Sequence, residues 1–376
     1  MVLVVTIKEA VTKKDLVKFM EFPLDLYKGN PYYVPDILSS QVADMQKDKN
    51  PAFEFCQSKA FLACRDGKIV GRIQGIVNER ANATFGKKYM CFTQVDFIND
   101  DEVVDALFDT VESWAKELGC EAMHGPLGFS DMDREGMLIE GFDQQSLFHT
   151  YYNHPYYPEQ LARRGYGKEV DWLEMRLTLP TEPIESLTKV SEYVKKRKKL
   201  HVVNLGDKPI KEIIGDMFAL YNKAYVLFGM IPLTPAQIDK YVGEFRPMVD
   251  KRTTSFVYTE DGEMVAFGIC CPRLDNAMQK MQGKTVPFGW IHLLKSLKGK
   301  NDTVDLLLIA VRPDLQGQGV NAIILDDMQH KLIKHGVRYA ETGPMLEVND
   351  HILAQWDRFN GVQHKRRRCF VKELEA

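Results

Sequence analysis

A glycine-containing turn near the C-terminus combines residues that suit the binding of a phosphate group. The stretch "IAVRPDLQGQGVNAIIL" (309–325) passes from an apolar strand through a proline and two glycines into helical spacing. Glycines let a backbone approach a ligand closely, and the first turn of a helix presents unpaired N–H groups at the positive end of its dipole. We expect a pyrophosphate here, and an ordinary strand-to-helix turn is the alternative. The residues assigned to this site are Ile309, Ala310, Val311, Gln316, Gly317, Gln318, Gly319, Val320, Asn321 and Ala322.

Candidate acid and base groups follow in the stretch "RYAETGPMLEVN" (338–349). Glu341 ends an apolar strand, where burial would raise its pKa toward a value that suits a general base. A structural carboxylate that accepts backbone N–H groups is the alternative. Glu347 and Asn349 are further catalytic candidates, and helix capping is the alternative for both.

Composition limits the class of protein. The chain has 376 residues, of which 45% are hydrophobic and 27% charged, and its formal net charge is −3. These values predict two globular domains with no general attraction to nucleic acid or to a membrane. Seven scattered cysteines, without a C-x-x-C pair or zinc-like histidine spacing, predict no metal site and a reducing compartment. No signal peptide or long apolar run is evident, so we expect a cytoplasmic protein.

One order of elements occurs twice. Each half begins with a predicted hairpin, around Asp66-Gly67 and around Asp261-Gly262, and continues as strand, helix, strand, helix and closing strand. The sequence therefore predicts an α/β fold with mixed sheets, formed by a tandem duplication into residues 1–180 and 181–376. The boundary is placed at the proline-containing stretch "LTLPTEPIESL".

This order, with the turn at 316–321, resembles the GNAT superfamily of acyl-CoA-dependent N-acyltransferases. Its phosphate-binding signature is Q/R-x-x-G-x-G/A, and Asn321 departs from the last position. The layout is similar to mycothiol synthase. Several motifs in order resemble an uncharacterised bacterial family of tandem GNAT-like proteins: "YKGNPYYVP" (27–35), "GRI" (71–73), "GPLGFS" (125–130), "GMLIEGFD" (136–143) and "YNHPYY" (152–157).

The resemblance implies acetyl-CoA or another acyl-CoA in the C-terminal half. In the N-terminal half, "INDDE" (98–102) stands where the glycine turn would be, and its acidic side chains would repel a pyrophosphate. We therefore expect a degenerate cofactor site there. The resemblance also implies a tyrosine acid on the last helix, but Trp356 or, with a shift of one, Asp357 occupies that place. Water or Tyr258 could protonate the CoA thiolate instead.

Three further segments bear on function. The long stretch 124–157 predicts an acceptor-amine site that faces the second half. The segment "PFGWIHLLKSLKG" (287–299) is a pocket wall or simply core, and the basic run 195–199 is a solvated helix end or an anion contact. The candidate acceptor-site residues are Asp131, Asp133, Arg134, Glu135, His149, Tyr152, Asn153 and Tyr156.

Two functions remain open. The first is an N-acyltransferase that acts on the amine of a small molecule or peptide, and the second is a non-catalytic acyl-CoA-binding or sensing protein. The sequence does not indicate the oligomeric state.

Overall fold

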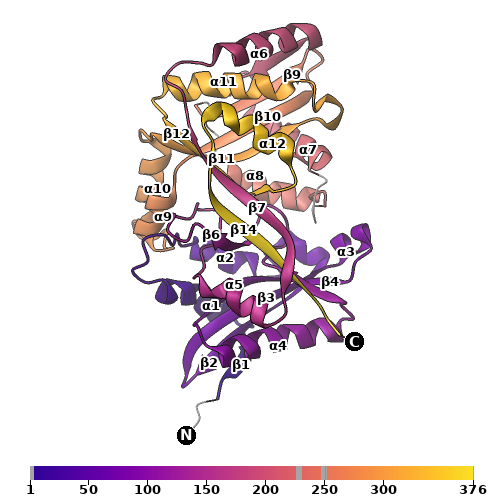
Figure 1. Cartoon of the computed structure of the whole chain (residues 1–376), viewed down its shortest axis with the longest axis vertical. Helices are drawn as coiled ribbons and strands as arrows, with labels where there is room; N and C mark the ends of the chain where they lie inside the picture. The colour runs from indigo at the N-terminus through magenta and orange to yellow at the C-terminus, as the bar shows by residue number, and fades with distance from the viewer. Residues whose placement is uncertain (1–3, 226–230, 247–249, 251, 376) are drawn as a thin grey trace.

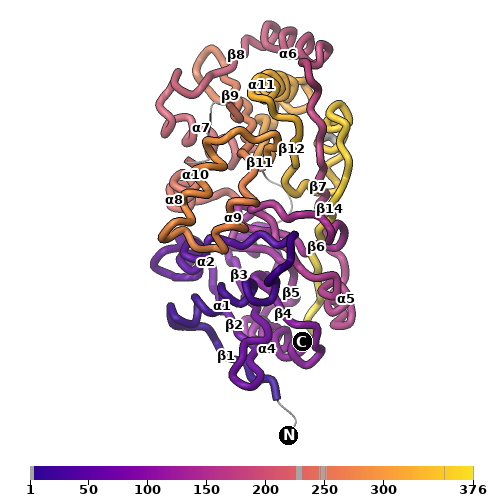
Figure 2. Tube along the Cα trace, turned by 90° about the vertical axis from the view of Figure 1, so that its left-hand side faces the viewer, coloured from indigo at the N-terminus to yellow at the C-terminus, as the bar shows by residue number. Residues whose placement is uncertain are grey.

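The computed structural model describes residues 4–225, 231–246, 250 and 252–375. Residues of the N-terminal half form the lower part of the molecule in Figure 1, and residues of the C-terminal half form the upper part. Two long strands, β7 (Gly167–Thr178) and β14 (Val362–Glu373), run side by side from one part to the other. The side view in Figure 2 shows the same two-part arrangement.

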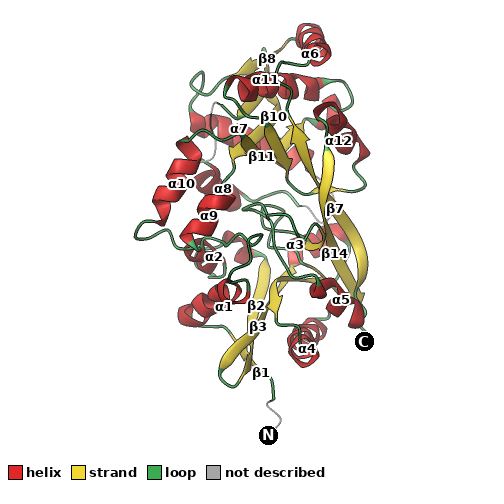
Figure 3. Ribbon diagram, turned by 60° about the vertical axis from the view of Figure 1, so that its left-hand side comes forward, coloured by secondary structure: helices red, strands yellow, loops and turns green. Residues whose placement is uncertain are grey.

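The remaining elements alternate between strands and helices, as Figure 3 shows. The other strands are β1 (Thr6–Glu9), β2 (Cys56–Arg65), β3 (Lys68–Asn78), β4 (Tyr89–Phe97), β5 (Ala122–Gly125), β6 (Met137–Glu140), β8 (Leu200–Val203), β9 (Thr254–Thr259), β10 (Met264–Pro272), β11 (Thr303–Val311), β12 (Tyr339–Thr342) and β13 (Met345–Leu346). The helices are α1 (Lys13–Leu26), α2 (Leu38–Asp44), α3 (Glu79–Phe85), α4 (Asp101–Glu117), α5 (Tyr156–Arg163), α6 (Glu185–Lys198), α7 (Ile210–Ala224), α8 (Pro235–Phe245), α9 (Asp275–Met281), α10 (Gly289–Lys298), α11 (Val320–Lys334) and α12 (Asp350–Ala354), with 3₁₀ turns η1 (Pro51–Glu54), η2 (Pro313–Leu315) and η3 (Gln355–Phe359).

The strands form one mixed sheet, which confirms the predicted α/β class. Its order is β1-β2-β3-β4-β5-β14-β7-β12-β11-β10-β9-β8. The pairs β4–β5 and β11–β12 are parallel, and the others along this path are antiparallel. Asp66 and Gly67 join β2 to β3 with positive φ angles of 54° and 71°, the backbone that a tight hairpin turn needs.

The last strand of each half is built into the part of the sheet that belongs to the other half. β14 lies between β5 and β7, with Phe370 opposite Gly125. β7 in turn pairs with β12, with Arg176 opposite Glu341. The two halves therefore depend on each other for their hydrogen bonding, and a division at residue 180 stays a prediction about folding units.

The helices cover the sheet with the faces that the sequence spacing indicates. On α4, Val103, Leu107, Val111 and Trp114 are buried in the N-terminal core. In the C-terminal half, α6 and α11 pack together above the sheet. No helix in the described part of the chain has the length and apolar character that a bilayer-spanning helix needs.

Candidate functional site

The glycine turn presents a group of backbone donors that have no protein partner. Gly317 and Gly319 adopt positive φ angles of 70° and 79°, and Gly319 is the N-cap of α11. Within the described residues, the N–H groups of Gly317, Gly319, Val320 and Asn321 donate to no protein acceptor. Such donors at a helix N-terminus form an anion site, because they point outward together with the positive end of the helix dipole.

Side chains around this turn hold its shape and add positive charge. The amide of Gln316 donates to the carbonyl of Val311 at 3.1 Å. Gln318 donates to the carbonyl of Asp314 at 2.5 Å and accepts a hydrogen bond from Lys198, at the end of α6. The basic run 195–199 therefore lies next to the turn, which is the arrangement that its anion-contact interpretation requires.

The corresponding turn in the N-terminal half is closed by its own side chains. The carboxylate of Asp100 accepts from the N–H of Val103 at 3.2 Å and from Arg65 at 2.7 and 3.0 Å. Arg65 also pairs with Glu102 at 2.8 Å. The acidic stretch therefore caps α4 and places negative charge where an anion would have to bind.

A cleft opens where β11 and β12 separate. The two strands pair in parallel up to Leu306 and Thr342, and the last bridging contact is the N–H of Gly343 to the carbonyl of Leu306 at 3.0 Å. Beyond this point lies a cavity of about 380 Å³. Most of its walls are apolar. They include Leu306, Leu307, Leu308, Ile309, Leu325, Met328, Leu332, Met345, Leu346, Trp356 and Phe359.

The N-terminal half adds titratable side chains to this cleft. Of the eight residues predicted from the long stretch 124–157, Asp131, Asp133, Glu135 and His149 line the cleft. The other four have structural contacts. Arg134 pairs with Asp36 at 2.7 Å, and Tyr152, Asn153 and Tyr156 hydrogen-bond to backbone groups.

Burial shifts the pKa values of these acidic groups upward. Burial, reinforced by the neighbouring Asp133, raises the pKa of Asp131 to about 7. Burial likewise raises the pKa of Asp133 to about 6, and that of Glu135 well above its usual range. A carboxyl group with a pKa near 7 can both accept and return a proton at neutral pH.

His149 lies at the point where the strands separate. Its Nε2 atom is 3.3 Å from the position that a Cβ atom would take on Gly343. Both ring nitrogens are buried, and neither has a hydrogen-bond partner among the described residues. Burial, together with the cations Arg134, Lys365 and Arg367, lowers its pKa to about 3. His149 is therefore a neutral imidazole whose two ring nitrogens are free to bind a ligand.

Comparisons with known proteins bear on the fold of the chain. No protein-family model matches the chain. It is 25% identical to protein YghO of Escherichia coli (strain K12), covering 98% of this chain and 95% of the relative. It is 22% identical to the bacterial ceramide synthase of Caulobacter vibrioides, covering 96% of each. A tandem GNAT protein from the clavulanic acid biosynthesis pathway superimposes with a TM-score of 0.57 at 11% identity, covering 99% of both chains.

The chain has a tandem GNAT fold. β11, β12 and α11 occupy the places expected for the fourth and fifth strands and the third helix of the C-terminal half. The glycine turn lies between β11 and α11, where the phosphate-binding signature is predicted.

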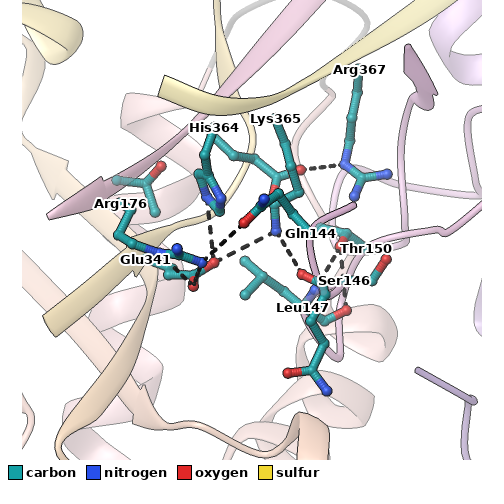
Figure 4. Close-up of polar contacts among 12 residues, drawn as sticks. Gln144, Ser146, Leu147, Thr150, Arg176, Glu341, His364, Lys365 and Arg367 are labelled. Carbon is teal, nitrogen blue, oxygen red and sulfur yellow. Dashed lines mark hydrogen bonds and ion pairs between the residues drawn. The ribbon is translucent and has the colours of Figure 1, made fainter. Parts of the chain in front are cut away.

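Glu341, on the fifth GNAT strand, is enclosed by cations (Figure 4). Its Oε1 atom accepts from Arg273 at 2.9 Å and from Arg176 at 3.0 Å, and its Oε2 atom lies 3.4 Å from His364 and 3.6 Å from Lys365. Burial alone would raise its pKa, but the surrounding cations outweigh burial and lower it. The predicted upward shift of this pKa was therefore wrong. Ala340 and Thr342 line the cleft, so Glu341, between them, projects from the other face of β12.

The other predicted catalytic residues are also bound in structural contacts. Glu347 pairs with Lys168 at 2.5 Å and accepts from the N–H of Asp171 at 3.3 Å, outside the cleft. Asn349 lines the cleft and caps α12, accepting from the N–H of Ile352 at 3.4 Å. Their catalytic roles remain predictions.

The aromatic candidates differ in their access to the cleft. Trp356 lines it, but its indole N–H donates to the sulfur of Met345 at 3.0 Å. Tyr258 donates to Asp216 at 2.9 Å and does not line the cleft. Sequence reasoning missed Tyr225, which lines the cleft and donates to the carbonyl of Ile309 at 2.8 Å. No local signal marks Tyr225, because its position depends on how α7 packs against β11.

A buried polar cluster lies elsewhere, where β4, β5, β7 and β14 meet. Ligand-type atoms of His124, Glu169 and Cys369 lie within 4.8 Å of one another. His124 pairs with Glu169 at 2.8 Å through Nδ1 and contacts the sulfur of Cys91 at 3.2 Å through Nε2, and Cys369 donates to Glu169 at 3.4 Å. Because these side chains hydrogen-bond to one another, we interpret the cluster as a structural network.

Proposed function

We propose that the protein is an acyl-CoA-dependent N-acyltransferase, with acyl-CoA in the C-terminal half and an amine acceptor between the two halves. The observation that carries the proposal is a single cleft. Its walls are mainly apolar side chains of the half with the glycine turn, and the other half adds Asp131, Asp133, Glu135 and His149 to the titratable groups that line it. The strand separation at Gly343 and the imidazole of His149 meet inside it.

The proposed position of CoA follows from the donors around the turn. The pyrophosphate would accept from the free N–H groups between Gly317 and Asn321, and Lys198 would add an electrostatic contact from α6. Asn321 departs from the usual signature, but its backbone N–H remains available. The acyl thioester would lie between β11 and β12, near Gly343.

The proposed chemistry uses groups that face the cleft. Asp131, with a pKa of about 7, takes a proton from the ammonium form of the acceptor. The amine nitrogen attacks the thioester carbon to give a tetrahedral intermediate. As it collapses, the C–S bond breaks, and the second proton of the nitrogen passes through the hydroxyl of Tyr225 or through water to the departing CoA thiolate. Neutral His149 donates a hydrogen bond to the developing oxyanion. We prefer Asp131 to Glu341 as the base because Glu341 is held in ion pairs outside the cleft.

The acceptor class follows from the walls of the cleft. They are lined mainly by leucine, isoleucine, methionine and aromatic side chains, and a cavity of this kind favours an apolar substituent next to the reacting amine. A relative aligned over 96% of this chain is called a ceramide synthase, and a ceramide is the N-acyl derivative of a long-chain amino alcohol. We therefore propose an amine that carries a long apolar chain.

A second candidate is an acyl-CoA-binding or sensing protein without turnover. Two contacts favour it: the indole at Trp356, where many GNAT enzymes carry a tyrosine acid, and the ion pairs that hold Glu341. In this case the cleft would bind acyl-CoA without acyl transfer, and the polar groups of the N-terminal half would respond to the bound ligand.

Thiol release separates the two candidates. Purified protein is incubated with acetyl-CoA or a long-chain acyl-CoA and one amine at a time: a long-chain amino alcohol, a polyamine, an amino acid or a short peptide. Thiol release that depends on the long-chain amine, with the amide identified by mass spectrometry, is expected. Calorimetric binding of acyl-CoA without release with any of these amines would favour the sensing protein. Absence of CoA binding would contradict both proposals.

A further inference from the structure

The segment 284–300, "KTVPFGWIHLLKSLKGK", exposes apolar side chains on the surface of the C-terminal half. Val286 is 77% exposed, Phe288 69%, Trp290 49% and Leu294 40%. These four large apolar side chains lie within nine consecutive positions. Isolated exposed apolar side chains are common on proteins, but a group confined to one short segment marks a contact surface.

The helix in this segment has a second apolar face that is packed. Leu293 and Leu297 of α10 contact the cluster formed by Val34, Cys271 and Leu274. Trp290 and Leu294 lie on the outer side, one turn apart. Packing within the fold therefore accounts for one side of α10 and leaves the other without a partner in this chain. Figure 3 shows α10 at the periphery of the molecule, beside α9.

The charges of the segment indicate what covers this face. It contains Lys284, Lys295, Lys298 and Lys300 and no acidic residue. All four lysines are exposed, and none forms an ion pair with a described residue. Cores of protein–protein interfaces are depleted in lysine, whereas segments that lie in a bilayer interface combine lysine with tryptophan, phenylalanine and leucine.

The indole of Trp290 fits the same environment. Its N–H donates to the carbonyl of Pro287 at 3.1 Å, so its polar atom is already satisfied within the loop. The ring can therefore enter the headgroup region of a bilayer without leaving a buried donor unpaired.

We propose that residues 284–300 form a docking surface for anionic phospholipid membranes. Val286, Phe288, Trp290 and Leu294 insert among the headgroups, and the lysines bind lipid phosphates. The net charge of −3 of the chain does not oppose this contact, because a local group of lysines acts within a short screening distance. This proposal replaces the expectation, drawn from net charge alone, that no membrane is involved.

The position of the segment connects this surface to the cleft. Leu293 and Leu297 pack against the same cluster as Phe148 and Leu307, and both of the latter also line the cleft. α10 and this cluster therefore lie between the docking surface and the proposed amine site. The docking surface itself does not depend on acyl transfer and is tested without it.

The tryptophans provide a specific reporter of docking. The chain has four, of which Trp114, Trp172 and Trp356 are buried and Trp290 is exposed. The full-length protein is titrated with vesicles of phosphatidylcholine or of an equal mixture with phosphatidylglycerol. A blue shift of emission with the anionic vesicles, which salt weakens, is expected. The Trp290→Phe variant should still sediment with these vesicles but lose the shift.

Two charge variants locate the surface. V286D/F288D places carboxylates at the proposed insertion point, and binding to anionic vesicles should fall at least about ten-fold. Val190→Asp is the matched control, because Val190 is 42% exposed on α6, beside the basic run 195–199; it should bind like the parent. All three side chains are exposed, so equal melting temperatures should verify that each variant is folded.

Three results would overturn the proposal. The first is the absence of any shift or sedimentation with anionic vesicles. The second is unchanged binding by V286D/F288D, or an equal loss in Val190→Asp, which would assign the contact to general basic charge. The third is a concentration-dependent dimer that V286D/F288D dissociates while vesicles do not bind, which would assign the surface to a second copy of the chain.

Discussion

Replacing Glu341 by glutamine tests whether this carboxylate holds the fold or performs the chemistry. Glu341 is 1% exposed, and its partners Arg273, Arg176 and Lys365 come from outside β12. The substitution keeps the volume and one oxygen acceptor but removes the negative charge. Lys365 is fully buried, so the change leaves positive charge without full compensation in the interior.

The expected loss of stability is large for a single substitution. Removing one partner of a buried ion pair costs about 3–5 kcal/mol, and a hydrogen bond to a charged group contributes about 1.5–3 kcal/mol. Glutamine retains an acceptor, and the 45% exposed Arg176 is partly screened by solvent. We therefore expect a loss of about 3 kcal/mol in urea unfolding at neutral pH. Glu347→Gln, at a partly exposed carboxylate, should lose about 1 kcal/mol or less.

The pH dependence of stability is an independent test of the role of Glu341. The pKa of Glu341 is lower in the folded protein than its ordinary value of 4.5. Its stabilisation is therefore complete above pH 4.5 and disappears as the pH falls through the lowered folded pKa. The difference between parent and variant should shrink in acid. If Glu341→Gln unfolds at the parental urea concentration but loses turnover, the structural reasoning is refuted, and Glu341 becomes the base.

Three further results are expected. Gly319→Glu should abolish CoA binding in calorimetry, because it places an anion at the proposed phosphate turn. Gly336 has a similar φ of 77° at the other end of α11, so Gly336→Glu is the control and should bind CoA normally; equal affinities of the two variants would contradict the proposed site. Asp131→Asn should lower kcat/KM by about 10²–10⁴ and remove the loss of rate below about pH 7. The protein should not lose stability, because the raised pKa shows that burial disfavours the carboxylate. An unchanged fall in rate at acidic pH would exclude Asp131 as the base. Residues 1–180 and 181–376 should be insoluble when expressed separately and should associate when coexpressed, because β14 completes the N-terminal part of the sheet. Cooperative unfolding of residues 1–180 alone would show that this part folds without β14.

Local signals were sufficient for much of the fold and for the proposed phosphate turn. Asp66-Gly67 predicts a hairpin because both positions need positive φ, and the apolar spacing on α4 predicts the face that is buried. The glycine turn is also local, since its donors belong to a few consecutive residues. The free N–H groups at Gly317 and Gly319 lie where the sequence predicts them.

The cleft and its electrostatics depend on contacts between distant parts of the chain. No local pattern indicates that β14 inserts beside β5, since strand pairing across the two halves is decided by packing of the whole sheet. The same crossing surrounds Glu341 with cations and reverses the expected direction of its pKa shift. His149 meets Gly343 for the same reason. A pKa depends on burial and on every nearby charge, and only the folded chain brings those groups together.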